Sequence, residues 1–151
     1  MRRTIPIFLL ALLAFGQDTK PDFTGTWQVV DKDPSHARPK NEIKQAGTTL
    51  SIKHLLEGGQ TTEWSVYPTD GTVKKTKEGR HTITRTGRWE GRKLILEETG
   101  PGNAPWRSST SREELTLSDD GKILTLSFHA KSGDSRHDYK VEFERVSTLS
   151  G

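Results

Sequence analysis

The sequence predicts an all-β fold, an antiparallel up-and-down β-barrel of about 8–10 strands. Apolar and polar residues alternate with a period of two, which is typical of strands with one buried and one solvated face. Turn signals rich in Gly, Asp and Ser separate these runs at short intervals, and no window shows the periodicity of an amphipathic helix. Antiparallel strands without helices close into a barrel or stack as a sandwich, and the short hairpins favour the barrel.

Residues 1–16 have the three-part pattern of a secretory signal peptide. Arg2 and Arg3 form a short basic stretch, residues 5–15 are apolar apart from Pro6, and small residues stand at Ala14 and Gly16. We expect cleavage after Gly16 and a secreted or periplasmic mature protein. A membrane-spanning helix needs roughly 20 apolar residues, so we expect no membrane segment in the mature form.

Composition limits what the mature chain can do. Loss of Arg2 and Arg3 lowers the net charge from +3 to +1, so the basic isoelectric point indicates no nucleic-acid partner. About a quarter of the remaining residues are apolar, which is enough for one modest core and one domain. The chain has no cysteine, which excludes disulfides, thiol chemistry and lipid attachment through cysteine.

Turn signals and two longer loops divide the chain into the predicted elements. After the signal peptide we expect a lead segment over residues 17–24, a barrel over 25–146 and a tail over 147–151. The clearest hairpin lies at Asp120-Gly121, between two alternating runs. Proline-containing loops are expected at 31–41 and 100–109, because proline cannot donate to a strand ladder. The alternating cores of the predicted strands are residues 27–29, 50–52, 64–66, 94–96, 115–117, 124–128 and 139–143.

Residues 22–27, Asp-Phe-Thr-Gly-Thr-Trp, carry the resemblance to a family. They resemble the opening of lipocalin-like proteins of the calycin superfamily, and residues 88–96 and 115–126 are similar to hairpins of short secreted bacterial members whose function is uncharacterised. The resemblance implies that Gly25 and Trp27 close one end of the barrel and that Arg145, from the last strand, packs over the indole. Such a cation–π contact contributes roughly 0.5–2 kcal/mol.

Thr-Gly-x-Trp occurs twice, at residues 24–27 and again at 86–89. A barrel built from two related halves would explain the repeat. The chain is rich in Thr and Gly, so we interpret the repeat as coincidence.

Five residues are candidates for contact with a small hydrophobic ligand. Trp64 and Trp89 stand at alternating strand positions that could face inward, where they either line a cavity or fill the core. Trp106 lies in a Pro/Gly loop and would serve as a lid over the barrel mouth or fold back to plug it. An inward-facing Arg85 and His81 could neutralise an anionic head group, although the basic run that includes His81 also fits a solvated hairpin end.

The sequence offers little for catalysis. Its five histidines lack the spacing that would place two on one face, so we expect no metal and no cofactor. The pairs Glu97-Glu98 and Glu113-Glu114 point to opposite faces of a strand, so neither can form an acid–base couple. Nucleophile and phosphate-loop motifs are absent, and we name no catalytic residue.

The leading hypothesis is a lipocalin-like barrel that binds a small, partly hydrophobic molecule without chemistry, as a monomer or small homo-oligomer. The alternative is a protein-interaction or inhibitor module with a filled barrel that acts through its loops. A small β-barrel hydrolase or isomerase ranks third, and it would need His81, Arg85 and a carboxylate in one inward cluster.

Overall fold

The fold is all-β and antiparallel, as predicted. The computed structural model describes residues 19–30, 40–101 and 108–146, so the predicted signal peptide, Trp106 and the tail lie outside the described residues. In these ranges a single 3₁₀ turn, Glu57–Gly59, is the one helical element, and no helix is long and apolar enough to span a membrane. The ten strands are β1 (Gly25–Val29), β2 (Lys40–Ala46), β3 (Thr49–Leu55), β4 (Ser65–Pro68), β5 (Val73–Glu78), β6 (His81–Glu90), β7 (Lys93–Pro101), β8 (Ser108–Leu117), β9 (Ile123–Ser132) and β10 (Ser135–Arg145).

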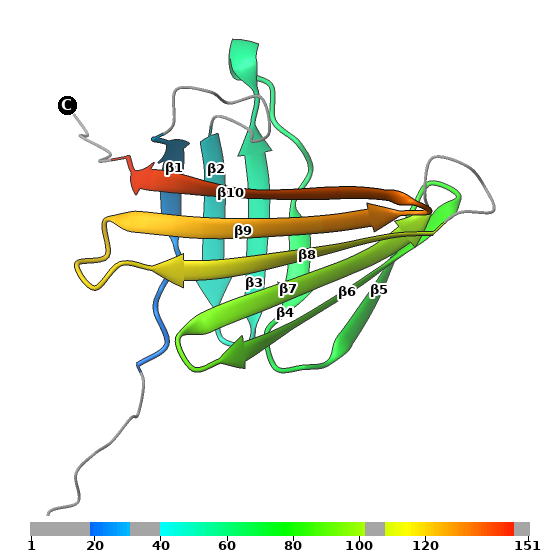
Figure 1. The fold of residues 1–151 in the computed structure, drawn as a ribbon, viewed down its shortest axis with the longest axis horizontal. Coiled ribbons are helices and arrows are strands. Elements are labelled where there is room, and N and C mark those ends of the chain that lie inside the picture. The colour runs from blue at the N-terminus through cyan, green and yellow to red at the C-terminus, as the bar shows by residue number, and fades with distance from the viewer. Residues whose placement is uncertain (1–18, 31–39, 102–107, 147–151) are drawn as a thin grey trace, which may run out of the picture.

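All ten strands belong to one sheet in the order β4-β3-β2-β1-β10-β9-β8-β7-β6-β5. The pairing of β1 with β10 joins the first strand to the last and curls the sheet on itself. Strands β1–β4 run steeply across the longer β6–β10, which extend beyond them on one side (Figure 1). The result is a nearly closed barrel whose two sheet edges, β4 and β5, face each other.

The predicted hairpin at Asp120-Gly121 joins β8 to β9. The carboxylate Oδ1 of Asp120 accepts a hydrogen bond from the backbone N–H of Lys122 at 3.0 Å. The Ser118 hydroxyl accepts one from the N–H of Ile123 at 2.9 Å. Short polar side chains thus satisfy the backbone donors of the turn, which fixes the register of the two strands.

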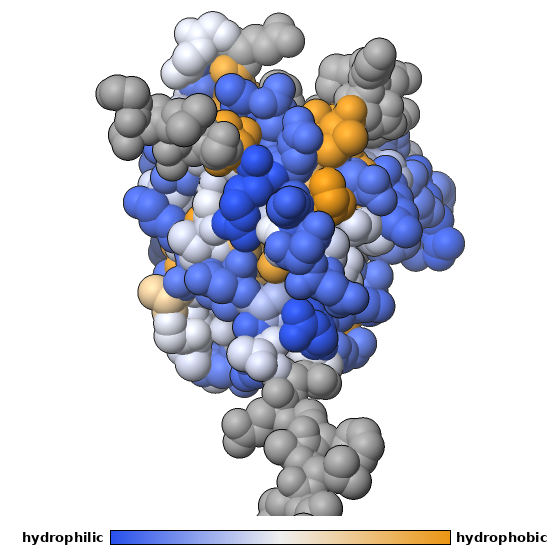
Figure 2. Space-filling view, turned by 90° about the vertical axis from the view of Figure 1, so that its left-hand side faces the viewer, coloured by the Kyte–Doolittle hydropathy of each residue, from blue (hydrophilic) through white to orange (hydrophobic). Residues whose placement is uncertain are grey.

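The core occupies the inner face of the barrel, where alternate residues of each strand meet. The face seen in Figure 2 is mostly hydrophilic, with small separate hydrophobic groups, as expected when apolar side chains point inward. The buried hydrophobic cluster consists of Phe23, Trp27, Ile43, Leu50, Ile52, Tyr67, Leu94, Leu96, Leu115, Leu124, Val141 and Phe143.

The seam between β4 and β6 is closed by a close backbone approach. A Cβ atom added at Gly87 would lie 2.3 Å from the carbonyl oxygen of Pro68, the last residue of β4. The N–H of Gly71, in the turn after β4, donates to the carbonyl of Gly87 at 2.8 Å. Only glycine leaves room for the two strands at this point.

We predict that Gly87→Ala destabilises the protein by about 3 kcal/mol, because the new methyl group meets backbone that cannot move aside. Gly100→Ala is the matched control, since its Cβ would lie 2.8 Å from the flexible Cδ1 of Ile83 and should have a much smaller effect. Urea unfolding followed by circular dichroism compares the two. Equal losses would contradict a closely packed seam at Gly87.

Candidate functional site

One end of the barrel is filled by Trp27. Its indole is fully buried, and Nε1 donates a hydrogen bond to the carbonyl of Phe23 at 2.9 Å. The guanidinium carbon of Arg145 lies 4.4 Å from the ring centroid, and Nη1 of Arg145 donates to the carbonyl of Thr24 at 2.6 Å. A Cβ at Gly25 would lie 2.7 Å from that same Nη1. The Gly-x-Trp motif and the last strand therefore form one packed unit.

Trp89, the last residue of the second Thr-Gly-x-Trp copy, packs at the same end of the barrel as Trp27. The ring of Trp89 stacks on Phe23 with centroids 5.9 Å apart and an angle of 8° between the planes. Phe23 itself is held by a hydrogen bond from its N–H to Oε1 of Gln45 at 3.0 Å. Both tryptophans thus converge on Phe23 in the lead segment, a structural use of the repeat that the interpretation as coincidence missed.

The inner face of β6–β10 changes from apolar to polar with distance from Trp27. Cross-strand pairing arranges the inward side chains in rows, and each row takes one residue from each of the five strands. Leucines 94 and 115 in the first row are fully buried, whereas Glu113 and Phe128 in the second row are only half-buried. The rows are Trp89, Leu94, Leu115, Leu126 and Val141; then Gly87, Leu96, Glu113, Phe128 and Tyr139; then Arg85, Glu98, Ser111, Ala130 and His137.

A polar network crosses the seam at the third row. The carboxylate oxygen Oε2 of Glu98 accepts hydrogen bonds from the Tyr67 hydroxyl at 2.9 Å and from Nε of Arg85 at 3.1 Å. Arg85 is 5 % exposed, its guanidinium lies 5.6 Å from the Tyr67 ring centroid, and Nη2 contacts Glu78 at 3.1 Å. Burial, together with Glu113 and Glu98, raises the pKa of Tyr67, which keeps the hydroxyl protonated as a donor.

Glu113 lies beside this network without belonging to it. None of the described residues forms an ion pair with its carboxylate, and the charge that acts on it is that of Glu98. Because no fully buried side-chain oxygen among these residues lacks a hydrogen-bond partner, the carboxylate oxygens reach solvent. Its pairing partners are Leu96 on β7 and Phe128 on β9, and Phe128 stacks on Tyr139 with ring centroids 4.7 Å apart. Burial first, and the charge of Glu98 second, raise the pKa of Glu113 to about 7. A carboxylate without a counter-ion thus faces an aromatic and apolar wall.

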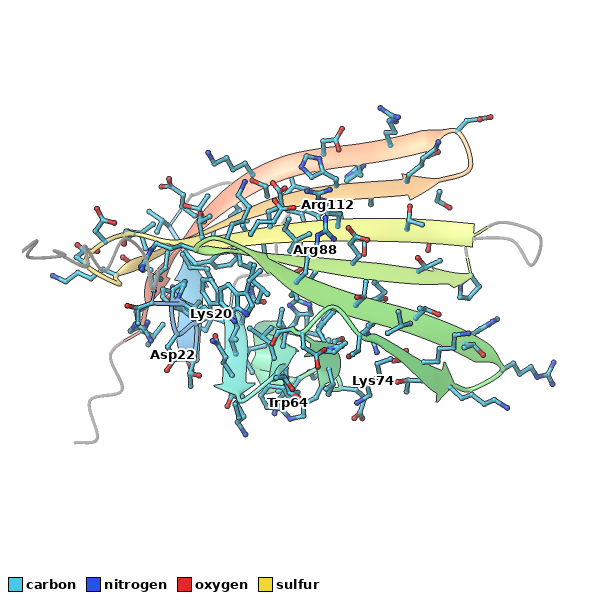
Figure 3. All side chains as sticks on the ribbon, turned by 90° about the horizontal axis from the view of Figure 1, so that it is seen from below. Lys20, Asp22, Trp64, Lys74, Arg88 and Arg112 are labelled. Atoms are coloured by element: carbon cyan, nitrogen blue, oxygen red, sulfur yellow. The ribbon has the colours of Figure 1, made fainter. Side chains whose placement is uncertain are left out.

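The neighbouring carboxylates face outward, as the strand period predicts. Glu97 accepts from Nη1 of Arg88 at 2.9 Å, and Glu114 accepts from Nη2 of Arg112 at 2.8 Å. Figure 3 labels both arginines. These pairs flank Ile95, which is fully buried on the outer face. Sequence reasoning separated the members of each Glu-Glu pair correctly but missed that Glu98 and Glu113, one from each pair, lie near each other inside.

The structure contradicts the predicted inward position of Trp64, leaves His81 at a solvated hairpin end and gives Trp89 the core-filling alternative. Trp64 faces outward, with the ammonium groups of Lys44 and Lys53 at 4.7 and 5.1 Å from its ring, because Ser65 and Tyr67 take the inward positions of β4. His81 is exposed at the β5–β6 hairpin, so His81, Arg85 and a carboxylate do not form the cluster that an enzyme would need. Trp89 packs at the filled end, where the ammonium group of Lys20, labelled in Figure 3, lies 5.7 Å from its ring centroid.

Arg85 is buried and inward, but its charge is already met by Glu78 and Glu98. The expectation that it neutralises an anionic head group is therefore not supported by its surroundings. Within the described ranges, no group of three or more His, Cys, Asp or Glu side chains could hold a metal ion.

A groove of about 400 Å³ also lies over β7–β10. It is lined mainly by outward-facing side chains, among them Arg112, His129 and Asp138. Nδ1 of His129 lies 2.8 Å from Oδ1 of Asp138, and Arg112 pairs with Glu114. Its charges are largely satisfied on the protein, unlike that of Glu113.

The fold and the site define a lipocalin-like β-barrel with one plugged end and a polar region toward the other. Two solved structures from Ramazzottius varieornatus share the fold. A secretory abundant heat soluble protein superposes with a TM-score of 0.56 and 13 % identity, over 82 % of this chain and 95 % of that one. Secretory abundant heat soluble protein 4 gives a TM-score of 0.50 and 10 % identity, over 82 % and 94 %. At these identities the likeness shows the fold alone, and no family model and no curated protein matches the chain.

We predict that Glu113→Gln stabilises the protein above pH 7. The folded state holds the proton of Glu113 more tightly than the unfolded state, so ionisation on raising the pH from about 4.5 to about 7 favours unfolding. Removing that ionisation should add of order 1–3 kcal/mol at pH 8 and almost nothing at pH 4.

Glu114→Gln is the control for this experiment. The hydrogen bond from Arg112 lowers the pKa of Glu114, so this substitution should give no gain at pH 8. Urea unfolding at pH 4, 6 and 8 measures all three proteins. A pH-independent difference between Glu113→Gln and wild type would contradict the raised pKa.

Proposed function

We propose that the barrel binds a small, partly apolar molecule in its interior, without chemistry on it. The observation that carries the proposal is the uneven burial of the side chains on the inner face. Leucines 94, 115 and 124 are fully buried near Trp27, whereas Leu126, Phe128 and Glu113 remain partly accessible although they face inward. An interior filled throughout would bury all of these side chains equally.

The composition of the inner rows supports the same proposal. The third row carries Ser111 and Ala130, whose small side chains occupy less of the interior than the leucines of the first row. A ligand whose apolar part contacts Leu126 and Phe128 would place a polar group beside Glu113 and Glu98. Sites of this kind are mostly apolar with a few placed polar groups.

The test is titration with N-phenyl-1-naphthylamine, a neutral probe whose emission rises in apolar surroundings. We expect saturable binding to the wild-type protein and at least a tenfold weaker affinity for Leu126→Trp, because the larger side chain fills the interior. Ser127→Trp adds the same side chain on the outer face of the adjacent position and should leave the affinity unchanged.

Circular dichroism checks that both variants are folded. The proposal fails if the wild-type protein gives no saturable signal, or if both tryptophan variants bind like the wild type. Either result would favour a filled barrel that acts through its outer surface.

A further inference from the structure

At the level of Glu113, the inner face carries more negative than positive charge. Arg85 contacts Glu78 and Glu98 and has no further carboxylate within reach. The charged group that acts on Glu113 is another carboxylate, that of Glu98. Lys74 stands opposite Arg85 in the β5–β6 pairing, but it is exposed on the edge strand and makes no ion pair with the described residues (Figure 3).

An anionic head group placed at this level would meet two partly buried carboxylates. Their repulsion is stronger than at the open surface, because partly buried charges are screened less by water. A cationic head group would instead supply the missing partner of Glu113. Ammonium–carboxylate hydrogen bonds are among the stronger polar contacts in proteins.

The aromatic pair beside Glu113 favours the same charge. Phe128 is the cross-strand partner of Glu113, and Tyr139 stacks on Phe128 from β10. The negative faces of aromatic rings attract cations, so the rings and the carboxylate act in one direction. Leu126, the half-buried leucine of the first row, lies next to this group and would contact an apolar tail.

We propose that the barrel selects amphipathic amines: the ligand's ammonium group pairs with the Glu113 carboxylate beside Phe128, and its apolar tail lies toward Leu126. This inference rests on the proposed function, and it reverses the charge of the head group expected from Arg85 and His81. The titratable groups coupled to Glu113 are Glu98 on β7 and Tyr67 on β4, and Tyr139 on β10 stands in the same row.

Three dansyl probes with similar tails test the selectivity. Dansylcadaverine carries an ammonium group, its N-acetyl derivative is neutral, and dansyl-6-aminohexanoate is anionic. At pH 8 we expect dansylcadaverine to bind at least tenfold more tightly than the neutral probe and the anionic probe most weakly. The preference for the amine should shrink at pH 5, where Glu113 is protonated.

Glu113→Gln and Glu114→Gln separate a binding role from a structural one. Glu113→Gln should lose at least tenfold in dansylcadaverine affinity at pH 8 and keep the affinity for the neutral probe. Glu114→Gln, on the outer face, should bind all three probes like the wild type.

The outcomes distinguish the amine selectivity from the proposed ligand binding itself. Equal binding of the three probes, or an unchanged amine affinity in Glu113→Gln, overturns the amine selectivity and leaves ligand binding in place. Absence of saturable binding by all three probes contradicts both. Tighter binding of the anionic probe would overturn the amine selectivity and indicate that Arg85 binds the head group of the ligand.

Discussion

Closure of the seam between β4 and β6 is the constraint on which the barrel depends. The meander leaves β4 and β5 as sheet edges, and an open edge exposes unpaired backbone groups. Gly87 allows the end of β4 to approach, and the Tyr67 hydroxyl and Arg85 share one oxygen of Glu98 across the gap. Hydrogen bonds to charged groups contribute about 1.5–3 kcal/mol each. These side-chain contacts therefore offset the backbone hydrogen bonds that the two edge strands do not form with each other.

Use of Glu98 at the seam determines the chemistry of the interior. Because Arg85 and Tyr67 are committed to Glu98, Glu113 has no partner among the described residues and lies beside Phe128. Trp27, Arg145 and Phe23 fill the opposite end, where water has no access to the core. The interior is therefore apolar at the plugged end and carries an unpaired acid toward the other end. This difference in polarity between the two ends is the physical basis for proposing an amphipathic ligand.

The local features of this fold were predictable, and the cross-strand ones were not. Period-two alternation predicts seven of the ten strands but not β2, β5 or β6. The resemblance of residues 22–27 assigned Arg145 to Trp27. Strand geometry also predicts that Glu97 and Glu98 separate. The meeting of Glu98 with Glu113 depends on the β7–β8 register, which pairs Glu113 with Leu96 and which no local pattern specifies. Trp64 shows a second limit, because Trp64 just before β4 and Tyr67 within it stand on opposite faces, and only packing decides that Tyr67 points inward.

The most direct measurement is the pKa of the Glu113 carboxyl group, followed by the ¹³C chemical shift of its side-chain carbonyl carbon in an NMR titration. Glu113→Gln assigns the resonance. We predict a Glu113 pKa of about 7. A pKa in the ordinary range of about 4.3 would show that the carboxylate is solvated or paired, and would contradict an uncompensated acid inside the barrel.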